Sequence, residues 1–317
     1  MPEAWKQWEG RTVGDKFQLQ RYLGGGDKSA VFLTEYAKLE SRKAAIKLVA
    51  VEPDSSEAQI SQWKQAAELS HPHLMRAFGV GRARLDGTEL LYLVMEYAEE
   101  VLSQSILNQP LSAAEAADLI GPILDALAYL HGKGLVHARL KPSNILSVKE
   151  QLKISSDGLC RISEVRHSSW SPGVYDPPGI SGRRISPSGD VWALGVTLVE
   201  ALTQRLPDRN EPETLPGPFH DIVIHCLQPD PQYRWTIAEI GTKLRVSASA
   251  TPVRQAGPAN WWRDVLLWQL QCPRCASSDL MRSRRRNAVE RALSTMFFPY
   301  RCGRCGARFW RRCPTTQ

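Results

Sequence analysis

The stretch Ser188–Leu202, SGDVWALGVTLVEAL, decides the fold because it is apolar nearly all round. A helix with this pattern is buried on every side, so we expect it at the centre of a sizeable domain. A second apolar run, IGPILDALAYL at 120–130, predicts another buried helix. Both runs are well short of a membrane span. With 43% hydrophobic and 23% charged residues among 317, the chain has the composition of a soluble globular protein.

The chain divides into four blocks around these helices. In the first block, β-type runs alternate with one helical stretch near residues 55–69, and the second block is mostly helical. A segment rich in Ser, Ala, Pro and Gly then predicts a linker, and a tail rich in Cys and Arg follows. The expected boundaries are 1–13 for an N-terminal extension, 14–245 for the main domain with its first part ending near residue 97, 246–259 for the linker, 260–271 for a short helix and 272–317 for the tail.

The N-terminal sequence MPEAWKQWEG contains no charged segment followed by an apolar one, so it predicts no export signal. Paired CxxC units in a chain without such a signal favour metal binding over disulfides. We therefore expect a cytoplasmic protein without a transmembrane segment.

Several motifs follow one another along residues 14–245. In LGGGDKSAVFL at 23–33, glycines allow backbone N–H groups to approach phosphates. In order and spacing, the motifs resemble a protein kinase domain of the bacterial serine/threonine type. The motifs that carry the resemblance are LGGGDKSAVFL, AAIK at 44–47, LLYLVMEYA at 90–98, HARLKPSN at 137–144, LKISSDGLC at 152–160 and PDPQYRW at 229–235.

The resemblance implies an α+β fold with two lobes, a β-rich first lobe and a helical second lobe. It implies that Lys47 holds the α- and β-phosphates of ATP, that Met95 lies at the back of the adenine pocket, and that Asn144 binds a metal. The residues that it assigns to nucleotide binding are Gly24, Gly26, Val31, Ala45, Lys47, Met95 and Asn144. The alternative is a pocket filled by side chains.

The residues that handle charge depart from the kinase pattern. Arg139 stands where the family has its catalytic aspartate, and a guanidinium stays protonated and cannot act as a base. Ala138 replaces the arginine that often contacts an activation-loop phosphate. Alignment on the following glycine places Ser156 at the metal-binding aspartate and Asp157 at the phenylalanine, so Mg²⁺ lacks its expected carboxylate.

Two further acidic positions are also changed. Counting back from HPHL places Gln62 where the family has a helix glutamate that pairs with the lysine. Gly179 replaces another glutamate, so Arg234 must find a different partner. Asp190, in contrast, matches the residue that ties the central helix to the catalytic-loop backbone. Fold-specifying residues are thus kept while catalytic charges are lost, and we assign no catalytic residue.

The tail contains CPRC and CGRC, with Cys272 and Cys275 in the first pair and Cys302 and Cys305 in the second. Two such pairs bring four thiolates into a tetrahedron around one ion. The tail therefore resembles a zinc ribbon with a structural Zn²⁺; iron or disulfides are the alternatives. It also carries 11 arginines and no lysine, interleaved with aromatic residues. This surface suits a protein partner, nucleic acid or an anionic membrane surface, or is simply solvated.

Three functions remain open from the sequence. The first is a catalytically impaired kinase-like regulatory or scaffold protein with a zinc ribbon, which acts on a protein partner and binds or does not bind nucleotide. The second is an atypical serine/threonine kinase that uses ATP with Asp157 or another acid. The third is a nucleic-acid-associated protein that acts through its basic ribbon.

Overall fold

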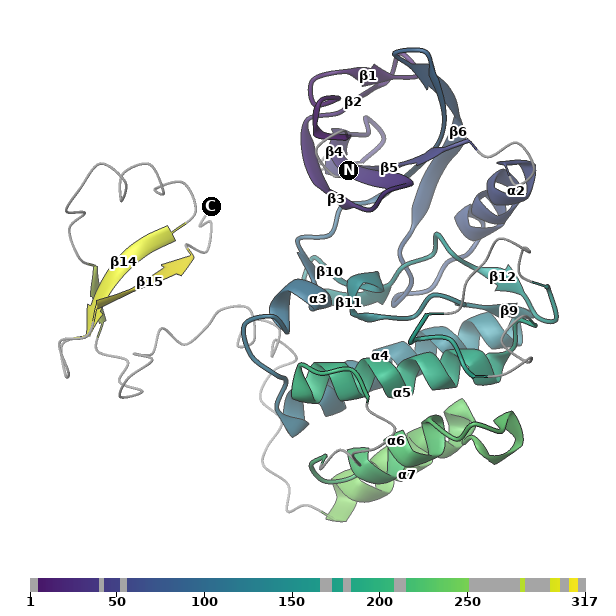
Figure 1. Cartoon of the computed structure of the whole chain (residues 1–317), viewed down its shortest axis with the longest axis vertical. Coiled ribbons are helices and arrows are strands. Elements are labelled where there is room, and N and C mark those ends of the chain that lie inside the picture. Colours follow the sequence, from purple (N-terminus) through teal and green to yellow (C-terminus); the bar gives the residue numbers. More distant parts are fainter. Residues whose placement is uncertain are drawn as a thin grey trace. The chain divides into compact units, whose positions relative to one another are not determined.

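The computed structural model describes residues 5–39, 43–51, 56–165, 173–178, 184–207, 215–250, 280–282, 297–302 and 308–312. The chain separates into two compact units, Met1–Val253 and Arg254–Gln317. The first unit has two lobes, a β-rich one and a helical one (Figure 1). Within the described residues, no helix has both the length and the hydropathy to cross a membrane.

The first lobe is built on a five-stranded antiparallel sheet with the order β3-β4-β5-β7-β6. Strict alternation of buried and less buried residues along β4 shows that the sheet has two different faces. One face is covered by α2 (Ser56–Ala67), whose Ile60 and Trp63 are buried against it. The strands of this lobe are β1 (Thr12–Val13), β2 (Phe17–Gln18), β3 (Arg21–Gly25), β4 (Ser29–Glu35), β5 (Lys43–Ala50), β6 (Ala77–Leu85) and β7 (Thr88–Glu96).

The opposite face of this sheet packs against the N-terminal segment. Trp5 and Trp8 are buried there, with their rings edge to face at 5.1 Å, and Val13 and Phe17 join the same cluster. The segment expected to be an extension over residues 1–13 is therefore part of the core from Trp5 onward. Burial of two indoles removes a large apolar area from water, which stabilises the position of this short segment.

The second lobe is organised around α5 (Pro187–Thr203), the helix expected at the centre of the domain. Its side chains are buried on nearly every side, from Asp190 to Leu202, which confirms the expectation from its sequence. Beside it lies α4 (Ala113–Gly132), whose N-terminus is closed by a reciprocal capping box between Ser112 and Glu115. The other helices are α3 (Leu102–Ser105), α6 (Phe219–Cys226), α7 (Ile237–Ala250) and the 3₁₀ turns η1 (Pro142–Asn144) and η3 (Pro231–Tyr233).

Short strands line the side of the second lobe that faces the first lobe (Figure 1). They are β8 (Glu100–Val101), β9 (Leu135–Val136), β10 (Ile145–Val148), β11 (Gln151–Ile154) and β12 (Cys160–Arg161). β10 pairs with β11 and β8, and β9 pairs with β12. These pairings hold the loops at residues 137–144 and 155–159 between the lobes.

The end of the main domain differs from the predicted boundary. α7 continues to Ala250, so the first five positions of the linker expected over 246–259 are helical. Ser and Ala in this stretch are compatible with a helix, and composition alone did not distinguish the helix end from a linker. The short helix predicted over 260–271 lies outside the described residues.

The second unit contains a three-stranded antiparallel sheet with the order β13-β14-β15. Its strands are β13 (Leu280–Arg282), β14 (Phe297–Cys302) and β15 (Arg308–Arg312). β14 pairs with both neighbours, so it is the central strand.

Candidate functional site in the cleft between the lobes

The glycine-rich hairpin between β3 and β4 forms a tight turn. Gly26 N donates to Ser29 O at 2.8 Å, and Gly24 lies opposite Val31. At Gly25, an added Cβ would lie 2.3 Å from Ser29 O, so only glycine fits this position. The sequence singled out Gly24 and Gly26, whereas the close approach that demands glycine is at Gly25.

Strand pairing gathers the predicted nucleotide residues on neighbouring strands. Val31 on β4 lies opposite Lys47 on β5, and Ala45 lies opposite Met95 on β7. Because Ala45 and Lys47 are two residues apart, their side chains leave the same face of the sheet. The sheet therefore brings Val31, Ala45, Lys47 and Met95 to one patch beside the glycine-rich hairpin.

The ammonium of Lys47 forms an ion pair and hydrogen bond with the carboxylate of Asp157. The Lys47 side chain is 18% exposed and that of Asp157 is 9% exposed. Burial would raise the pKa of the Asp157 carboxyl, but Lys47, Arg139 and a hydrogen bond from Ser155 together hold this pKa well below its usual range. Asp157 is thus a buried carboxylate in the cleft that is ionised at neutral pH.

This pairing differs from the alignment that places Ser156 at the metal-binding aspartate. Ser156 is buried, and its hydroxyl has no hydrogen-bond partner among the described residues. Asp157 is the residue whose carboxylate reaches Lys47. Asp157 lies in a turn with Gly158, and attraction to the Lys47 ammonium stabilises the orientation in which its carboxylate faces the cleft.

Helix α2 is attached to residues 157–164 by two side chains. The indole N–H of Trp63 donates to Asp157 O at 2.9 Å. The amide of Gln62, expected opposite Lys47, donates instead to Glu164 Oε1 at 3.1 Å. Lys47 pairs with Asp157 and not with a side chain of α2. The helix contacts this region through the backbone of Asp157 and the side chain of Glu164.

Asp190 holds the loop at residues 137–144 as the resemblance implies. Its carboxylate accepts from His137 N and Ala138 N, both at 2.8 Å, and lies 2.9 Å from His131 Nε2. Ala138 adopts a left-handed conformation with φ 60°, which costs free energy for a residue with a Cβ. The two backbone hydrogen bonds to a buried carboxylate stabilise this conformation.

Arg139 lies where a kinase has its catalytic aspartate, and it faces Asp157. An added Cβ on Gly158 would lie 2.7 Å from Arg139 Cδ, so the arginine stem covers this glycine. Arg139 O accepts from Asn144 Nδ2 at 2.6 Å. Asn144, predicted to contact a metal, thus holds the loop together through its amide nitrogen.

Comparison with known proteins identifies this arrangement. The sequence profile of the protein kinase domain matches residues 17–243. The chain belongs to the protein kinase family. This confirms the resemblance in the motifs between residues 23 and 235.

Relatives of this kinase-family chain include bacterial serine/threonine kinases. Serine/threonine-protein kinase PrkC of Bacillus subtilis is 25% identical over 263 residues, which cover 73% of this chain and 40% of the relative. Serine/threonine-protein kinase PknG of Mycolicibacterium smegmatis is 29% identical over 271 residues, 78% of this chain and 35% of the relative. The chain therefore spans less than half the length of these relatives.

A solved structure of a kinase domain shares the fold. The kinase domain of Mycobacterium tuberculosis PknI, crystallised as a double mutant, matches with a TM-score of 0.60 at 21% identity. The match covers 76% of this chain and 98% of that domain. The two-lobed kinase fold predicted from the sequence is confirmed.

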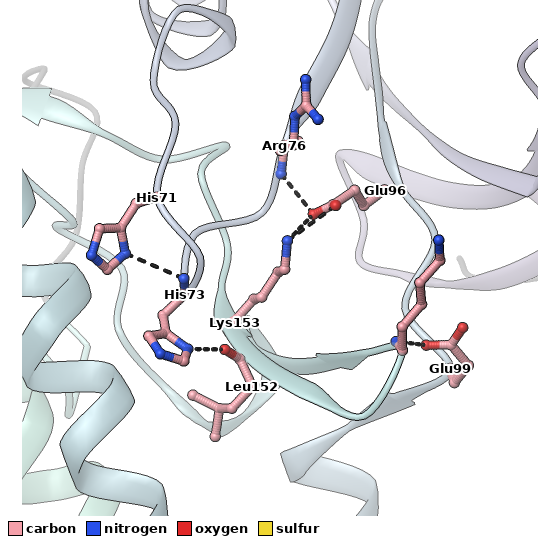
Figure 2. A network of polar contacts seen from close by, with 8 residues as sticks. His71, His73, Arg76, Glu96, Glu99, Leu152 and Lys153 are labelled. Carbon is pink, nitrogen blue, oxygen red and sulfur yellow. Dashed lines mark hydrogen bonds and ion pairs between the residues drawn. The ribbon is translucent and has the colours of Figure 1, made fainter. Parts of the chain in front are cut away.

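In this kinase fold, a polar network connects the strand that leads out of the first lobe to the second lobe (Figure 2). Lys153 Nζ on β11 lies 3.0 and 2.8 Å from the two carboxylate oxygens of Glu96, at the end of β7. Arg76 N donates to the same carboxylate at 2.9 Å. This ion pair was not predicted from the sequence, although a lysine between apolar residues in LKI indicates a buried cation that needs a carboxylate.

Arg234, left without its usual glutamate by Gly179, bonds to backbone carbonyls. Its guanidinium donates to Gln228 O at 2.6 Å, Pro229 O at 2.8 Å and Ser188 O at 3.1 Å. It also lies over the ring of Trp192 at 5.2 Å. Burial lowers the pKa of Arg234 from its usual value. Gly179 itself lies outside the described residues.

The predicted zinc ligands belong to the second unit. Cys272, Cys275 and Cys305 lie outside the described residues, and Cys302 is described only as the last residue of β14. In the parts of the chain that the structure describes, no group of His, Cys, Asp and Glu side chains is arranged for a metal ion.

Proposed function

We propose that this chain is a regulatory protein with a kinase fold and impaired phosphotransfer. The observation that carries the proposal is Arg139, which lies in the catalytic loop beside Asp157 and covers Gly158. A protonated guanidinium cannot accept the proton of a substrate hydroxyl. Phosphoryl transfer depends on positioning and charge neutralisation, and the guanidinium at this position supplies no base.

The charges around Asp157 also work against a bound Mg²⁺. A kinase uses its loop aspartate to ligate Mg²⁺, and Asp157 is the carboxylate here that could do so. The negative charge of Asp157 is already neutralised by Lys47, and Arg139 adds a second positive charge nearby. A metal ion would have to displace the ammonium and remain near the guanidinium, which costs Coulomb energy.

The residues fit the phosphates of a nucleotide better than they fit the metal. In the tight hairpin at Gly25, the lack of side chains at the glycines allows phosphates to approach the backbone N–H groups. Lys47, on the strand next to β4, supplies a cation. Lys47, Arg139 and the ionised Asp157 together leave one net positive charge for an anion in the cleft. We therefore propose nucleotide binding that does not require Mg²⁺.

The second candidate is an atypical serine/threonine kinase, and one observation favours it. The Lys47–Asp157 pair places a carboxylate beside the phosphate-binding lysine despite the altered motif. The relatives named above carry the name serine/threonine kinase, which agrees with this alternative.

Radiolabelled γ-phosphate transfer by the purified full chain separates the two candidates. We expect no transfer to itself or to generic protein substrates with Mg²⁺ or Mn²⁺, together with a thermal shift on adding ATP that persists in EDTA. Transfer that is abolished in both Lys47→Ala and Asp157→Asn would establish the atypical kinase and refute the regulatory proposal. Transfer that persists in both variants would indicate a contaminating kinase.

For the second unit we propose a structural zinc ribbon. Its support is the three-stranded antiparallel sheet, in which Cys302 ends the central strand, combined with the CPRC and CGRC pairs. A unit this small buries little apolar surface, so metal binding would supply much of its folding energy. We expect one zinc per chain by metal analysis; a chain that folds with no zinc or iron would refute the ribbon.

The regulatory proposal implies a protein partner for a cytoplasmic chain. The arginine-rich tail is available for such a partner, or for nucleic acid or an anionic membrane surface. Polyanion binding that is absent, or that does not weaken with salt, would exclude the last two.

A further inference from the structure

The sheet of the second unit is strongly basic. In it, β14 and β15 run side by side as an antiparallel pair, and β13 pairs with the other edge of β14 (Figure 1). From residue 272 on, the chain has 11 arginines and no lysine, against two acidic residues, Asp279 and Glu290. A charge imbalance of this size attracts polyanions. The arginines that lie in the three strands are Arg282, Arg301, Arg308, Arg311 and Arg312.

Strand register divides these arginines between the two faces of the sheet. Residues that pair across antiparallel strands share a face, and the faces alternate along each strand. Arg301 on β14 pairs with Arg308 on β15, so these two share a face. Trp310 and Arg312 follow Arg308 at intervals of two residues and lie on the same face. We call the face with Arg301, Arg308, Trp310 and Arg312 the arginine face.

The opposite face has the composition of a core. On the central strand it carries Phe298, Tyr300 and Cys302, which are two aromatic residues and a predicted zinc ligand. Tyr300 pairs with Phe309 of β15, which adds a third aromatic residue. An antiparallel sheet commonly packs one face on a core and leaves the other in water. This composition assigns the core to the face with Cys302 and leaves the arginine face for a ligand.

Two arginines meet across the strands of the arginine face. Arg301 lies directly opposite Arg308. Directly opposite residues have Cβ atoms about 4.5–5.5 Å apart, and like charges in such a pair destabilise the sheet. An anion bound by both guanidinium groups offsets this repulsion, and phosphate oxygens match guanidinium groups in pairs. Trp310, between Arg308 and Arg312 along β15, supplies an aromatic ring of the kind on which a base stacks.

We propose that the arginine face binds single-stranded nucleic acid, with its arginines on phosphates and a base on Trp310. The absence of lysine favours this ligand over an anionic membrane, because a membrane surface attracts lysine and arginine alike. Phosphates and bases recognise the planar guanidinium itself, which forms paired hydrogen bonds and stacks on rings. The proposal names a partner class for the arginine-rich tail and rests on the folded second unit, proposed above to be a zinc ribbon.

The test measures binding of fluorescein-labelled oligothymidylate and oligouridylate to the full chain by fluorescence anisotropy, between about 50 and 200 mM salt. We expect both to bind, and to bind more weakly as the salt concentration rises. Arg308→Gln should weaken binding and reduce the slope of log K against log salt by about 0.7, because one phosphate contact is lost. The matched control is Arg311→Gln, which removes the same charge from the same strand on the opposite face.

A second pair of variants tests the stacking residue. Trp310→Ala should weaken binding about tenfold with the salt slope unchanged, since it removes a ring and no charge. Trp310→Phe keeps a ring and should retain most of the affinity. Duplex DNA should bind more weakly than either single strand, because its bases are already stacked on one another.

Several results would overturn the proposal. They are no binding of either oligonucleotide, equal losses in Arg308→Gln and Arg311→Gln, or duplex DNA bound as tightly as the single strands. Binding to vesicles of phosphatidylserine and phosphatidylcholine without binding to oligonucleotides would assign the tail to a membrane surface instead. Metal analysis of the same samples keeps the two proposals apart. Bound zinc without oligonucleotide binding refutes only the arginine face, and oligonucleotide binding by a chain that holds no metal refutes only the zinc ribbon.

Discussion

The ion pair between Lys47 and Asp157 can be tested by its contribution to stability. The motif alignment, which places Ser156 at the metal-binding aspartate, does not predict this pair. Two unit charges about 4 Å apart attract by roughly 4 kcal/mol at an effective dielectric constant near 20. Removal of one partner from a buried pair leaves the other charge desolvated and costs about 3–5 kcal/mol. Lys47 keeps some contact with solvent, since its side chain is 18% exposed, and this reduces the cost. We therefore expect Asp157→Asn to lower the free energy of unfolding by about 3 kcal/mol.

A double-mutant cycle isolates the pair from the influence of Arg139. Lys47→Met and Asp157→Asn are each compared with the double variant by urea denaturation at pH 7. Because the double variant leaves neither charge unpaired, we expect it to be more stable than the sum of the single changes predicts. The expected coupling is about 2 kcal/mol, within the range found for residues in direct contact.

Ser156→Ala is the control for the competing alignment. Its hydroxyl is buried and unpartnered, so its removal should change the free energy of unfolding by less than about 0.5 kcal/mol or stabilise the fold slightly. An additive cycle, with coupling below about 0.5 kcal/mol, would refute the pairing of Lys47 with Asp157.

Four other results are expected. The difference in unfolding free energy between the unchanged chain and Asp157→Asn should be constant from neutral pH down to about pH 4 and should shrink below it. The pKa of the Asp157 carboxyl is depressed in the folded state, so its contribution to stability is complete above the pKa of the unfolded chain and is lost in acid. Arg234→Ala should lower the unfolding free energy by about 3 kcal/mol in urea, since three backbone carbonyls lose a charged donor; a change within about 0.5 kcal/mol, as at ordinary surface positions, would contradict this role. Lys153→Met should cost about 2–3 kcal/mol, and adding Glu96→Gln should recover part of the loss; no recovery would argue against the ion pair. A zinc chelator should make residues 272–317 sensitive to protease and leave the thermal unfolding of the kinase domain unchanged; equal protection with and without chelator would contradict a structural metal.

The buried helices of the second lobe could be predicted from their sequence. The all-apolar run at 188–202 became α5, and the run at 120–130 lies within α4. Both signals are local, because burial on all sides requires apolar residues on all sides. The two tryptophans at the N-terminus were not predicted to join the core. Their partners, such as Val13 and Leu90, are brought to them only by the folded sheet.

The candidate site was predicted less completely than the fold. Strand register brings Val31, Ala45, Lys47 and Met95 to one patch of the sheet, and their role in nucleotide binding stays a prediction. Asp157 lies in an irregular loop, where no periodic pattern in the sequence predicts which side chain faces the cleft. The new partners of Arg234 are backbone carbonyls, which every residue possesses, so no residue type marks them in the sequence.

The contacts of Asp190 explain how the catalytic loop keeps its shape with an arginine at position 139. Asp190 bonds to the backbone N–H groups of residues 137 and 138, and these groups are the same whatever side chains follow. Asn144 likewise bonds to the backbone carbonyl of residue 139, not to its side chain. The loop is therefore held by contacts that do not depend on the chemistry at position 139. An arginine can therefore stand at this position without loss of the fold.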